Sequence, residues 1–189
     1  MSTTNQTLGG RRIILGVCGG ISAYKSAALT SKLAQAGAQV TVLMTESATR
    51  FVSPMTFQAL SGKPVYSSIW EHVESNDPQH IATATGADLA VVAPCSMDCL
   101  SRLATGRADD VVTLVLSAVD RKKTPVFLVP AMNEVMWSQP ATQRNLVTLR
   151  GDGYDFIGPD DGWQACRAVG PGRMSEPDSI VEVILARLA

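Results

Sequence analysis

The chain has 189 residues, of which 46% are hydrophobic and 17% are charged, and its formal net charge is −1. This composition excludes a disordered chain, and the near-zero charge gives no basis for a broad nucleic-acid-binding or membrane-binding surface. No apolar run approaches the roughly 20 residues of a membrane-spanning helix. We therefore expect neither nucleic acid nor a membrane among the partners.

The first ten residues, MSTTNQTLGG, are polar and lack the basic and then apolar pattern of a secretory signal. We expect a disordered tail over residues 1–10, a single domain over residues 11–189, and a cytoplasmic protein. The charged fraction lies below the roughly 25% that is usual in soluble domains. This deficit indicates that subunits bury part of the surface, so we expect a homo-oligomer.

Strands and helices alternate along the chain. Apolar runs predict strands over residues 11–17, 39–44, 87–94, 125–130 and 154–158. Helices are predicted from an N-cap at Ser22 to a stop at Gly37, after an N-cap at Thr45, and over residues 54–61, 96–106, 109–120, 141–153 and 178–188. The segment 159–177 is rich in glycine and proline, and we expect a long loop there.

The run at residues 87–94 is apolar without alternation, which is typical of a parallel strand that is covered on both faces. The order of elements predicts an α/β fold with a doubly wound, mostly parallel sheet, which binds its ligand at the carboxyl ends of the strands. The unusual residues stand at those ends: residues 19–22, Thr45, residues 95–99 and Asn133. We expect the functional site there.

The turn GVCGGISAYK, at residues 16–25, could hold an anion. Gly19 and Gly20 let backbone N–H groups approach a ligand at the start of a helix. A turn that serves packing alone is the alternative. Thr45 and Ser47 at the end of the next strand favour a phosphate-bearing cofactor.

A second turn, APCSMDCLSRLATG at residues 93–106, has Ser96 as an N-cap candidate. Its backbone donors could hold the polar edge of a flat ring, although a capping Ser96 and a core-filling Met97 would account for the same residues. The chain has four cysteines, which are Cys18, Cys95, Cys99 and Cys166. We interpret them as reduced thiols, and because no Cys/His set has zinc spacing, we expect no metal site.

His80 begins a helix-like segment after a break at Asp77 and Pro78. A lone histidine is more often structural than catalytic, and the residues alone leave its role open. The segment GWQACRAVGPGRMSEP, at residues 162–177, is too rich in glycine to pack as a core element, yet it carries Cys166. A mobile flap that directs a thiol at a substrate competes here with a disordered connection.

The stretch PAMNEVMW, at residues 130–137, directly follows a predicted strand and contains Met132, Asn133, Met136 and Trp137. A neutral amide can hydrogen-bond a substrate carboxylate without the ion pair that would stabilise it against loss. The apolar side chains would then form a desolvated wall. Core filling is the alternative for the methionines.

Together these stretches resemble the flavin-dependent cysteine decarboxylases, and among them the phosphopantothenoylcysteine decarboxylases of coenzyme A biosynthesis. The resemblance runs from about residue 11 to residue 188 and rests on GVCGGISAYK, MTESATRF, HIATATGADLAVVAP, LATGRADDVVT, PAMNEVMW and ACRAVGPGRMSEP. It implies a Rossmann-like flavoprotein with a single flavin-binding decarboxylase domain. The implied substrate is 4′-phosphopantothenoylcysteine (PPC), and the implied product is 4′-phosphopantetheine.

The resemblance also implies a cofactor and residue roles. FMN would lie at a trimer interface, with His80 as the base and Cys166 as the proton donor of the final reduction. The substrate would contact Asn133, which grips its carboxylate, and also Met132, Ala165 and Arg173. FMN would contact Gly19, Gly20, Ser22, Thr45, Phe51, Ser96, Met97, Asp98 and Cys99.

Two positions depart from the family's pattern. Many members carry Ala-Asn-Thr after the third strand, where this chain has CSMDC at residues 95–99. The Pro-Cys-Ser-Met stretch is more similar to the flavin prenyltransferases of the same superfamily. Arg167 replaces the glycine that usually follows the flap cysteine.

Three alternatives remain. Peptidyl-cysteine oxidative decarboxylases share the first half of the reaction but lack the flap around Cys166, because the enethiol is their product. A flavin prenyltransferase needs no Asn133 clamp, and a non-catalytic flavin-binding subunit needs none of these groups. The sequence does not decide between a trimer and a dodecamer of trimers, or between a free-standing enzyme and one fused to or partnered with a phosphopantothenate–cysteine ligase.

Overall fold

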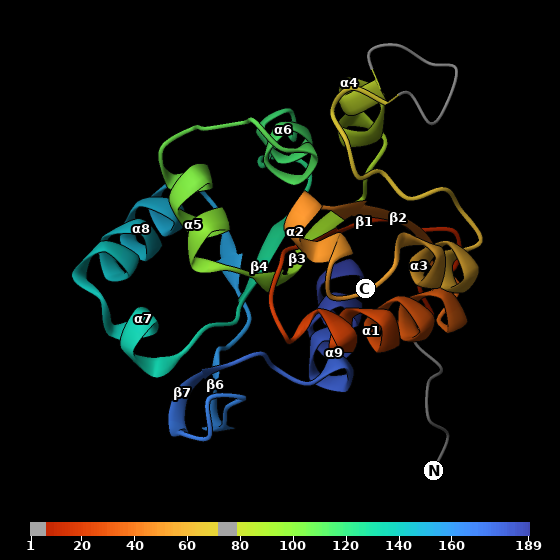
Figure 1. Ribbon diagram of the computed structural model, residues 1–189. Coiled ribbons are helices and arrows are strands. Elements are labelled where there is room, and N and C mark those ends of the chain that lie inside the picture. The colour runs from red at the N-terminus through yellow and green to blue at the C-terminus, as the bar shows by residue number, and fades with distance from the viewer. Residues whose placement is uncertain (1–6, 72–78) are drawn as a thin grey trace.

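The computed structural model describes residues 7–71 and 79–189 (Figure 1). Its central sheet has five parallel strands in the order β2-β1-β3-β4-β5. These strands are β1 (Arg12–Val17), β2 (Gln39–Met44), β3 (Leu89–Cys95), β4 (Val126–Pro130) and β5 (Asp155–Phe156). The predicted doubly wound α/β fold is confirmed. The strand order changes direction between β1 and β3, which is where such sheets open a crevice for a ligand.

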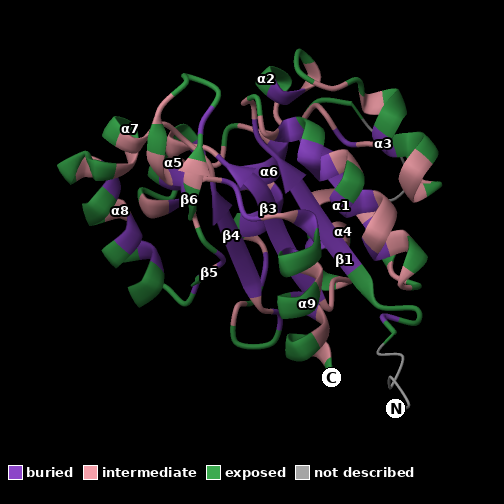
Figure 2. Cartoon of the chain, turned by 90° about the horizontal axis from the view of Figure 1, so that it is seen from below, coloured by how far each residue is buried: buried purple, intermediate pink, exposed green. Residues whose placement is uncertain are grey.

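Helices cover both faces of the sheet (Figures 1 and 2). One face carries α1 (Ala23–Gln35), α3 (Pro54–Ser61) and α9 (Pro177–Leu188). The other carries α4 (Gln79–Thr85), α5 (Met97–Ala104), α6 (Val111–Ser117) and α8 (Pro140–Gly151). Two short helices, α2 (Glu46–Thr49) and α7 (Glu134–Ser138), follow the carboxyl ends of β2 and β4.

The core forms two layers that share the central strands. Every residue of β3 is buried (Figure 2), and its side chains alternate, with Val91 in the cluster under α1 and Val92 in the cluster under α6. Burying each valine or leucine side chain contributes about 1.5–3 kcal/mol. The continuous apolar pattern of residues 87–94 therefore reflects burial on both sides of the sheet.

Hydrogen bonds fix the carboxyl ends of three strands relative to one another. The Ser26 hydroxyl of α1 donates to the Ala93 carbonyl at 2.6 Å and is fully buried. The backbone N–H of Cys18 donates to Pro94 O at 3.2 Å, and the N–H of Ala131 donates to Cys95 O at 3.1 Å. A buried unpaired carbonyl would cost roughly 1–3 kcal/mol, so these bonds hold the edge where the site lies.

The three residues predicted as N-caps stand at helix starts, and two of them cap their helix with the side chain. Thr45 accepts a hydrogen bond from the N–H of Ala48, and Ser96 accepts one from the N–H of Cys99. Ser22 stands at the N-cap position of α1, as predicted, but its dihedral angles are helical and its side chain makes no capping hydrogen bond. A serine side chain caps when its backbone is extended, so this hydroxyl is not used by the helix.

The prediction of a long loop over residues 159–177 is wrong for this segment. It contains an antiparallel hairpin of β6 (Asp160–Trp163) and β7 (Val169–Arg173) and the start of α9. These strands were not predicted because they are short, contain glycine and proline, and lie outside the main sheet. The expected disordered tail also does not reach residue 10, because Leu8 is 1% exposed and its N–H donates to Ala36 O at 2.7 Å.

Other boundaries differ by a few residues. The helix expected over 141–153 begins at Pro140, directly after the separate helix α7. Asp77 and Pro78, which were expected to interrupt the secondary structure before His80, lie outside the described residues. Across residues 7–71 and 79–189, no helix is long and apolar enough to span a membrane.

Candidate active site

Two adjoining cavities lie at the carboxyl ends of the strands. The first, which we name the hairpin cavity, has a volume of about 510 Å³ and lies between α1 and the β6–β7 hairpin. The second, the α5 cavity, has a volume of about 440 Å³ and lies at the start of α5. Both are lined by Gly19, Ser96, Met97 and Met136. Their sizes suit small-molecule ligands, which occupy pockets of about 300–1,000 Å³.

The β1–α1 turn forms one wall of both cavities. A Cβ atom at Gly19 would lie 2.4 Å from the Cβ atom of Ser47, so only glycine lets this turn pack against α2. A Cβ atom at Gly20 would meet nothing within 4 Å, because this residue faces open space beside the hairpin cavity. The Ser22 hydroxyl also lines that cavity. A glycine turn, an uncommitted hydroxyl and a helix start together suit an anionic group.

The start of α5 forms the wall between the two cavities. Met97 lines both cavities, while Asp98 lines only the α5 cavity. Arg102 forms ion pairs with Asp98, Asp109 and Asp110. Desolvation opposes the charge of Arg102, but the hydrogen bond and charge of Asp98 outweigh it and raise the pKa of the guanidinium. The α5 cavity therefore has a fixed, charged rim.

Cys18, Cys95 and Cys99 are buried beneath this wall, and all four cysteines are free thiols. Burial raises the pKa of Cys95, and the pKa of Cys18 is raised chiefly by its hydrogen bond to Cys99. These three thiols therefore stay protonated and inert near neutral pH. Within the described part of the chain, no group of three or more His, Cys, Asp or Glu side chains could hold a metal ion.

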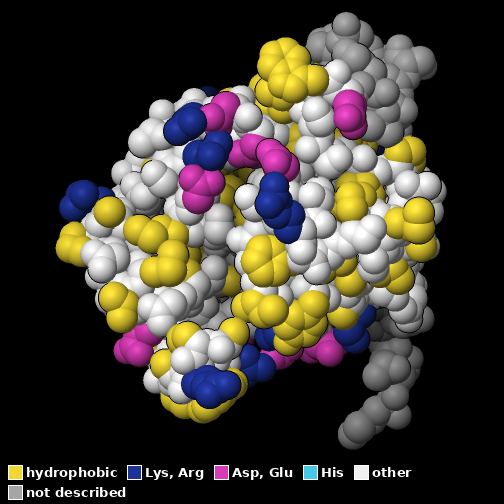
Figure 3. All heavy atoms as spheres, in the orientation of Figure 1, with side chains coloured by type: hydrophobic (Ala, Val, Ile, Leu, Met, Phe, Trp, Pro, Cys, Tyr) yellow, Lys and Arg dark blue, Asp and Glu magenta, His cyan; other side chains and the backbone are white. Residues whose placement is uncertain are grey.

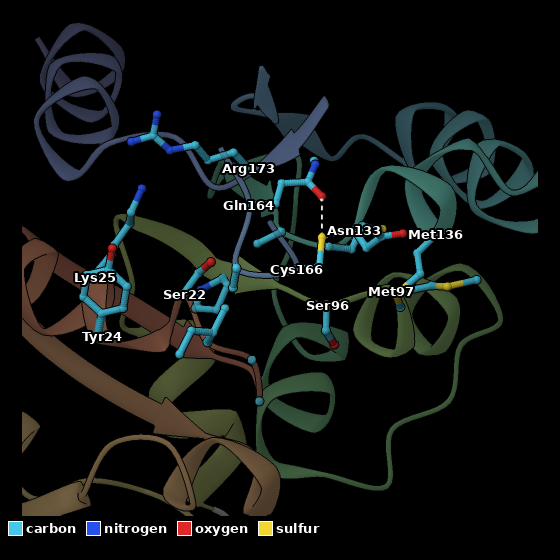
Figure 4. A pocket seen from close by; sticks show the side chains of 18 of the residues that line it. Ser22, Tyr24, Lys25, Ser96, Met97, Asn133, Met136, Gln164, Cys166 and Arg173 are labelled. Carbon is cyan, nitrogen blue, oxygen red and sulfur yellow. Dashed lines mark hydrogen bonds between the residues drawn. The ribbon is translucent and has the colours of Figure 1, made fainter. Parts of the chain in front are cut away.

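Asn133 lies at the end of β4, where it caps α7. Its Oδ1 accepts from the N–H of Val135 at 2.8 Å, and its Nδ2 donates to Cys166 Sγ at 3.3 Å (Figure 4). Capping fixes the side chain, so the amide N–H points at the hairpin. Met132 and Met136 line the cavity beside it, whereas Trp137 packs against the core. The stretch at 130–137 is therefore both a cavity wall and a core contact.

The β6–β7 hairpin docks on the end of β4 through its backbone. The N–H of Met132 donates to Gly172 O at 2.9 Å. A Cβ atom at Gly172 would lie 2.2 Å from Met132 O, and the φ angle of Gly172 is +123°, so the contact requires glycine. Arg167 has a φ of 66°, which for a side-chain-bearing residue costs about 1–2 kcal/mol.

Cys166 is exposed at the tip of the hairpin and lines the cavity. The hydrogen bond from Asn133 lowers the pKa of its thiol below the usual value, and a backbone hydrogen bond at Ala168 adds to the effect, while the charge of Glu134 opposes it. Of the four cysteines, only Cys166 is solvent-accessible and has a lowered pKa. It is therefore the reactive thiol of the chain.

Two cations lie on the opposite side of the hairpin cavity from Met136 (Figure 4). Lys25 is 8% exposed, and its Nζ donates to Met174 O at 3.1 Å and to Glu176 Oε1 at 2.9 Å. Arg173 pairs with the same carboxylate. The hydrogen bond from Lys25 lowers the pKa of Glu176. Because two cations share one carboxylate, this end of the cavity keeps a net positive charge.

Most of the residues that the sequence predicted lie around these cavities. The hairpin cavity is lined by Gly19, Gly20, Ser22, Ser96, Met97, Met132, Asn133, Ala165, Cys166 and Arg173, and the α5 cavity by Thr45, Asp98 and Cys99 among others. Two predicted residues line neither cavity. Phe51 is 53% exposed after α2, and His80 lies on α4, at the opposite end of the molecule from the hairpin (Figure 1).

Among the cavity residues that sequence reasoning missed are Lys25, Trp163 and Gln164. Lys25 could have been noticed, since a lysine interrupts the side of α1 that carries Ser26 and Leu29 and is otherwise suited to burial. Gln164 and Trp163 gave no such signal, because their segment has neither helical nor strand periodicity.

The fold and site define an α/β protein with a glycine-containing turn at the switch point and a thiol-bearing hairpin over the cavity. The family model "Flavoprotein" matches residues 1–189, so the chain belongs to the Flavoprotein family. It is 49% identical over 176 residues to the coenzyme A biosynthesis bifunctional protein CoaBC of Bacillus subtilis, a match that covers 93% of this chain and 43% of the relative. The corresponding Escherichia coli K12 protein is 42% identical over 183 residues, covering 97% and 44%. The chain thus spans less than half the length of these relatives.

Solved structures are similar over almost the whole chain. One is a cysteine-to-serine mutant of PPC decarboxylase complexed with pantothenoylaminoethenethiol, with a TM-score of 0.85, 29% identity, and coverage of 94% of this chain and 98% of that chain. Another is the FMN-dependent cysteine decarboxylase SpaF, with a TM-score of 0.81, 30% identity, and coverage of 96% and 99%.

The contact between Asn133 and Cys166 predicts the pH dependence of alkylation. Iodoacetamide should modify Cys166 selectively in the folded protein, with a half-maximal rate at a pH below that of an ordinary cysteine. Asn133→Ser keeps a capping oxygen but removes the amide donor, so the thiol pKa should rise toward its usual value. Peptide mass spectrometry across a pH series measures this. Asn145→Ser, on α8, is the control, and identical pH profiles for Asn133→Ser and the unaltered protein would contradict the assignment.

Proposed function

We propose that this chain is an FMN-dependent carboxy-lyase that converts PPC into 4′-phosphopantetheine during coenzyme A biosynthesis. The contact between Asn133 and Cys166 carries the proposal, because it brings a carboxylate-binding amide and an exposed thiol to one wall of the hairpin cavity. The names of the 42–49% identical relatives support the same pathway. We treat residues 11–189 as one flavin-binding decarboxylase domain.

The residues around the two cavities fit FMN. The open space at Gly20 and the unused hydroxyl of Ser22, at the start of α1, suit a phosphate. The flat ring would contact Thr45 and the first turn of α5, where Ser96, Met97, Asp98 and Cys99 line the α5 cavity. Bound FMN would supply reversible two-electron chemistry by storing a hydride from the substrate carbon that bears the thiol.

Asn133 and its neighbours would promote the loss of CO₂. A carbanion formed from ordinary cysteine has no electron sink, whereas the oxidised thioaldehyde accepts the electrons of the departing carboxylate. The Asn133 amide can hold that carboxylate by hydrogen bonds without the ion pair that would stabilise its charge. Met132 and Met136 exclude water from the same wall, which favours loss of a charged group.

Cys166 would donate a proton to the enethiol carbon that has lost CO₂, while the stored hydride would return to the carbon that bears the sulfur, and solvent would restore the thiol proton. The complex of the cysteine-to-serine mutant of PPC decarboxylase with an aminoethenethiol supports a thiol acid at this step. In this chain Cys166 is the candidate, since the other three thiols are buried. A saturated thiol product distinguishes this function from that of peptidyl-cysteine decarboxylases.

The cationic end of the hairpin cavity would bind the other end of the substrate. Arg173 and Lys25 lie across the cavity from Asn133 and Met136, and PPC carries its phosphate at the end remote from its cysteine. A net positive charge at that end suits a phosphate. Ala165 and Met132 would contact the part of the substrate between the two charged ends.

The site would be completed by a second copy of the chain. His80 lies on α4, away from both cavities, although the reaction needs a base near the substrate thiol. Ile21, Tyr24, Phe51 and Met55 are exposed, and hydrophobic side chains gather around the start of α1 and α2 (Figure 3). Burying such a patch between subunits is favourable. We propose a cytoplasmic homo-oligomer built from trimers, fused to or partnered with a phosphopantothenate–cysteine ligase.

Turnover of PPC by the FMN-loaded protein tests the proposed function. The unaltered protein should release CO₂ and form the saturated thiol. In a single turnover, Cys166→Ser should still release about one CO₂ per FMN and hold the enethiol, whose mass is lower than that of the product by two hydrogen atoms. Product formation should fall by about 10²-fold or more, as expected for loss of a general acid. Mass spectrometry of the products separates the two. No CO₂ from the unaltered protein, or normal product from Cys166→Ser, would refute the assignment.

Complementation tests whether a second copy supplies His80. His80→Ala and Cys166→Ser should each be inactive in full turnover, yet co-expression in equal amounts should restore about a quarter of normal activity, because one site in four pairs an intact His80 with an intact Cys166 in a cyclic oligomer. Mixing the separately purified, non-exchanging proteins is the control. Activity no higher than that of either variant alone would place both residues in the same chain.

A further inference from the structure

Gln164 is a buried polar residue at the centre of the hairpin, with 7% of its surface exposed. It follows β6 and lies two residues before Cys166 (Figure 4). Its backbone N–H donates to Ala168 O at 2.9 Å, and its carbonyl accepts from the N–H of Arg167 at 2.9 Å. These bonds close the turn that carries the thiol.

The side-chain amide of Gln164 joins the hairpin to α7. Its Nε2 donates to Pro171 O at 2.8 Å and to Gly170 O at 3.3 Å, which are carbonyls of β7. Its Oε1 accepts from the N–H of Glu134 at 3.2 Å, the first residue of α7. Only an amide can donate to two carbonyls and accept from an N–H in this arrangement, so the partners fix which way the oxygen points.

That oxygen also meets the thiol. Cys166 Sγ lies 3.5 Å from Gln164 Oε1 and 3.3 Å from Asn133 Nδ2. The thiol therefore has one donor and one acceptor around it. The N–H of Asn133 points at the sulfur, and the S–H proton points at the oxygen of Gln164. A thiol held between two fixed amides has one preferred orientation, which an exposed side chain otherwise lacks.

We propose that Gln164 is a positioning residue for the reaction, which holds Cys166 against Asn133 and couples closure of the hairpin on α7 to delivery of the proton. The role of Cys166 as the acid rests on the proposed function. Gln164 acts through the thiol and is not itself a proton donor. Its loss should leave the oxidative half of the reaction intact and slow the protonation step, since misplacing a reacting group by about 1 Å can cost roughly 10²-fold.

Gln164→Met tests the proposal because methionine keeps the length and bulk of the side chain but makes no strong hydrogen bonds. In a single turnover, the FMN-loaded variant should release about one CO₂ per FMN at close to the normal rate, hold the enethiol, and form product about 10²-fold more slowly. Without FMN or substrate, alkylation of Cys166 should shift to higher pH, as in Asn133→Ser, because the thiol loses its contact with the Asn133 donor. Loss of the Gln164 oxygen, which accepts from S–H, acts in the opposite direction, so the double variant should shift no further to higher pH. Val169→Ala, on the exposed face of β7, is the control for hairpin stability.

Gln164→Glu gives a second test through a pH profile. A protonated carboxyl group can donate to Pro171 O and accept from the N–H of Glu134, whereas an ionised one loses the donor and faces two carbonyls. The charged or titratable groups near this position are Cys166, whose Sγ lies 3.5 Å from Gln164 Oε1, Glu134, whose carboxylate lies beside Gly170 of β7, and Arg173, whose side chain lies beside Gly162 of β6. Product formation by this variant should therefore fall with rising pH through an ionisation that the unaltered protein lacks.

The outcomes are distinct. Unshifted alkylation together with normal product formation in Gln164→Met would overturn the proposal, and so would equal loss of CO₂ release and product formation, which indicates a structural role alone. If the unaltered protein released no CO₂, the proposed function would fail, while the alkylation profiles would still decide whether Gln164 positions the thiol.

Discussion

The docking of the β6–β7 hairpin on the end of β4 is the contact on which the rest of the site depends. It is made by the N–H of Met132 and the carbonyl of Gly172, and it leaves no room for a side chain on the glycine. Because the same turn of chain carries Asn133, the hairpin cannot dock without bringing Cys166 to the amide. A backbone contact between two segments far apart in sequence therefore brings together the Asn133 amide and the Cys166 thiol, which come from different segments.

The parallel sheet supplies the other half of the arrangement. Its strands end at one edge, so the glycine turn after β1, the capped start of α5 after β3 and the capped start of α7 after β4 meet there. Buried hydrogen bonds, such as that from Ser26 to Ala93, hold these ends in register. The cavity is thus lined by rigid elements on one side and by the hairpin on the other, which suits a site that holds a cofactor firmly and admits a substrate.

The sequence predicted those parts of the fold that follow from local pattern. Continuous apolar runs identified the buried strands, and the caps at Thr45 and Ser96 were correct, because both depend on near neighbours. The hairpin could not be predicted in this way. Its strands hold glycine and proline, and it is stabilised by the Gln164 amide and by a contact to Met132, more than thirty residues away. Ser22, by contrast, is a residue type that commonly caps helices, yet its side chain makes no capping hydrogen bond to α1. His80 and Phe51 line neither cavity, and the sequence of one chain does not tell which surfaces meet in an oligomer.

In the proposed reaction, the end of the hairpin cavity where CO₂ is lost carries little charge. A neutral amide, two methionines and a thiol surround the place assigned to the departing carboxylate, while the cations lie across the cavity. The most direct test is a crystal structure of Cys166→Ser grown with FMN and PPC. The account predicts a flavin against the first turn of α5 and a decarboxylated enethiol between Asn133 and residue 166, under the closed hairpin. A flavin bound elsewhere, or a ligand that touches neither residue, would contradict it.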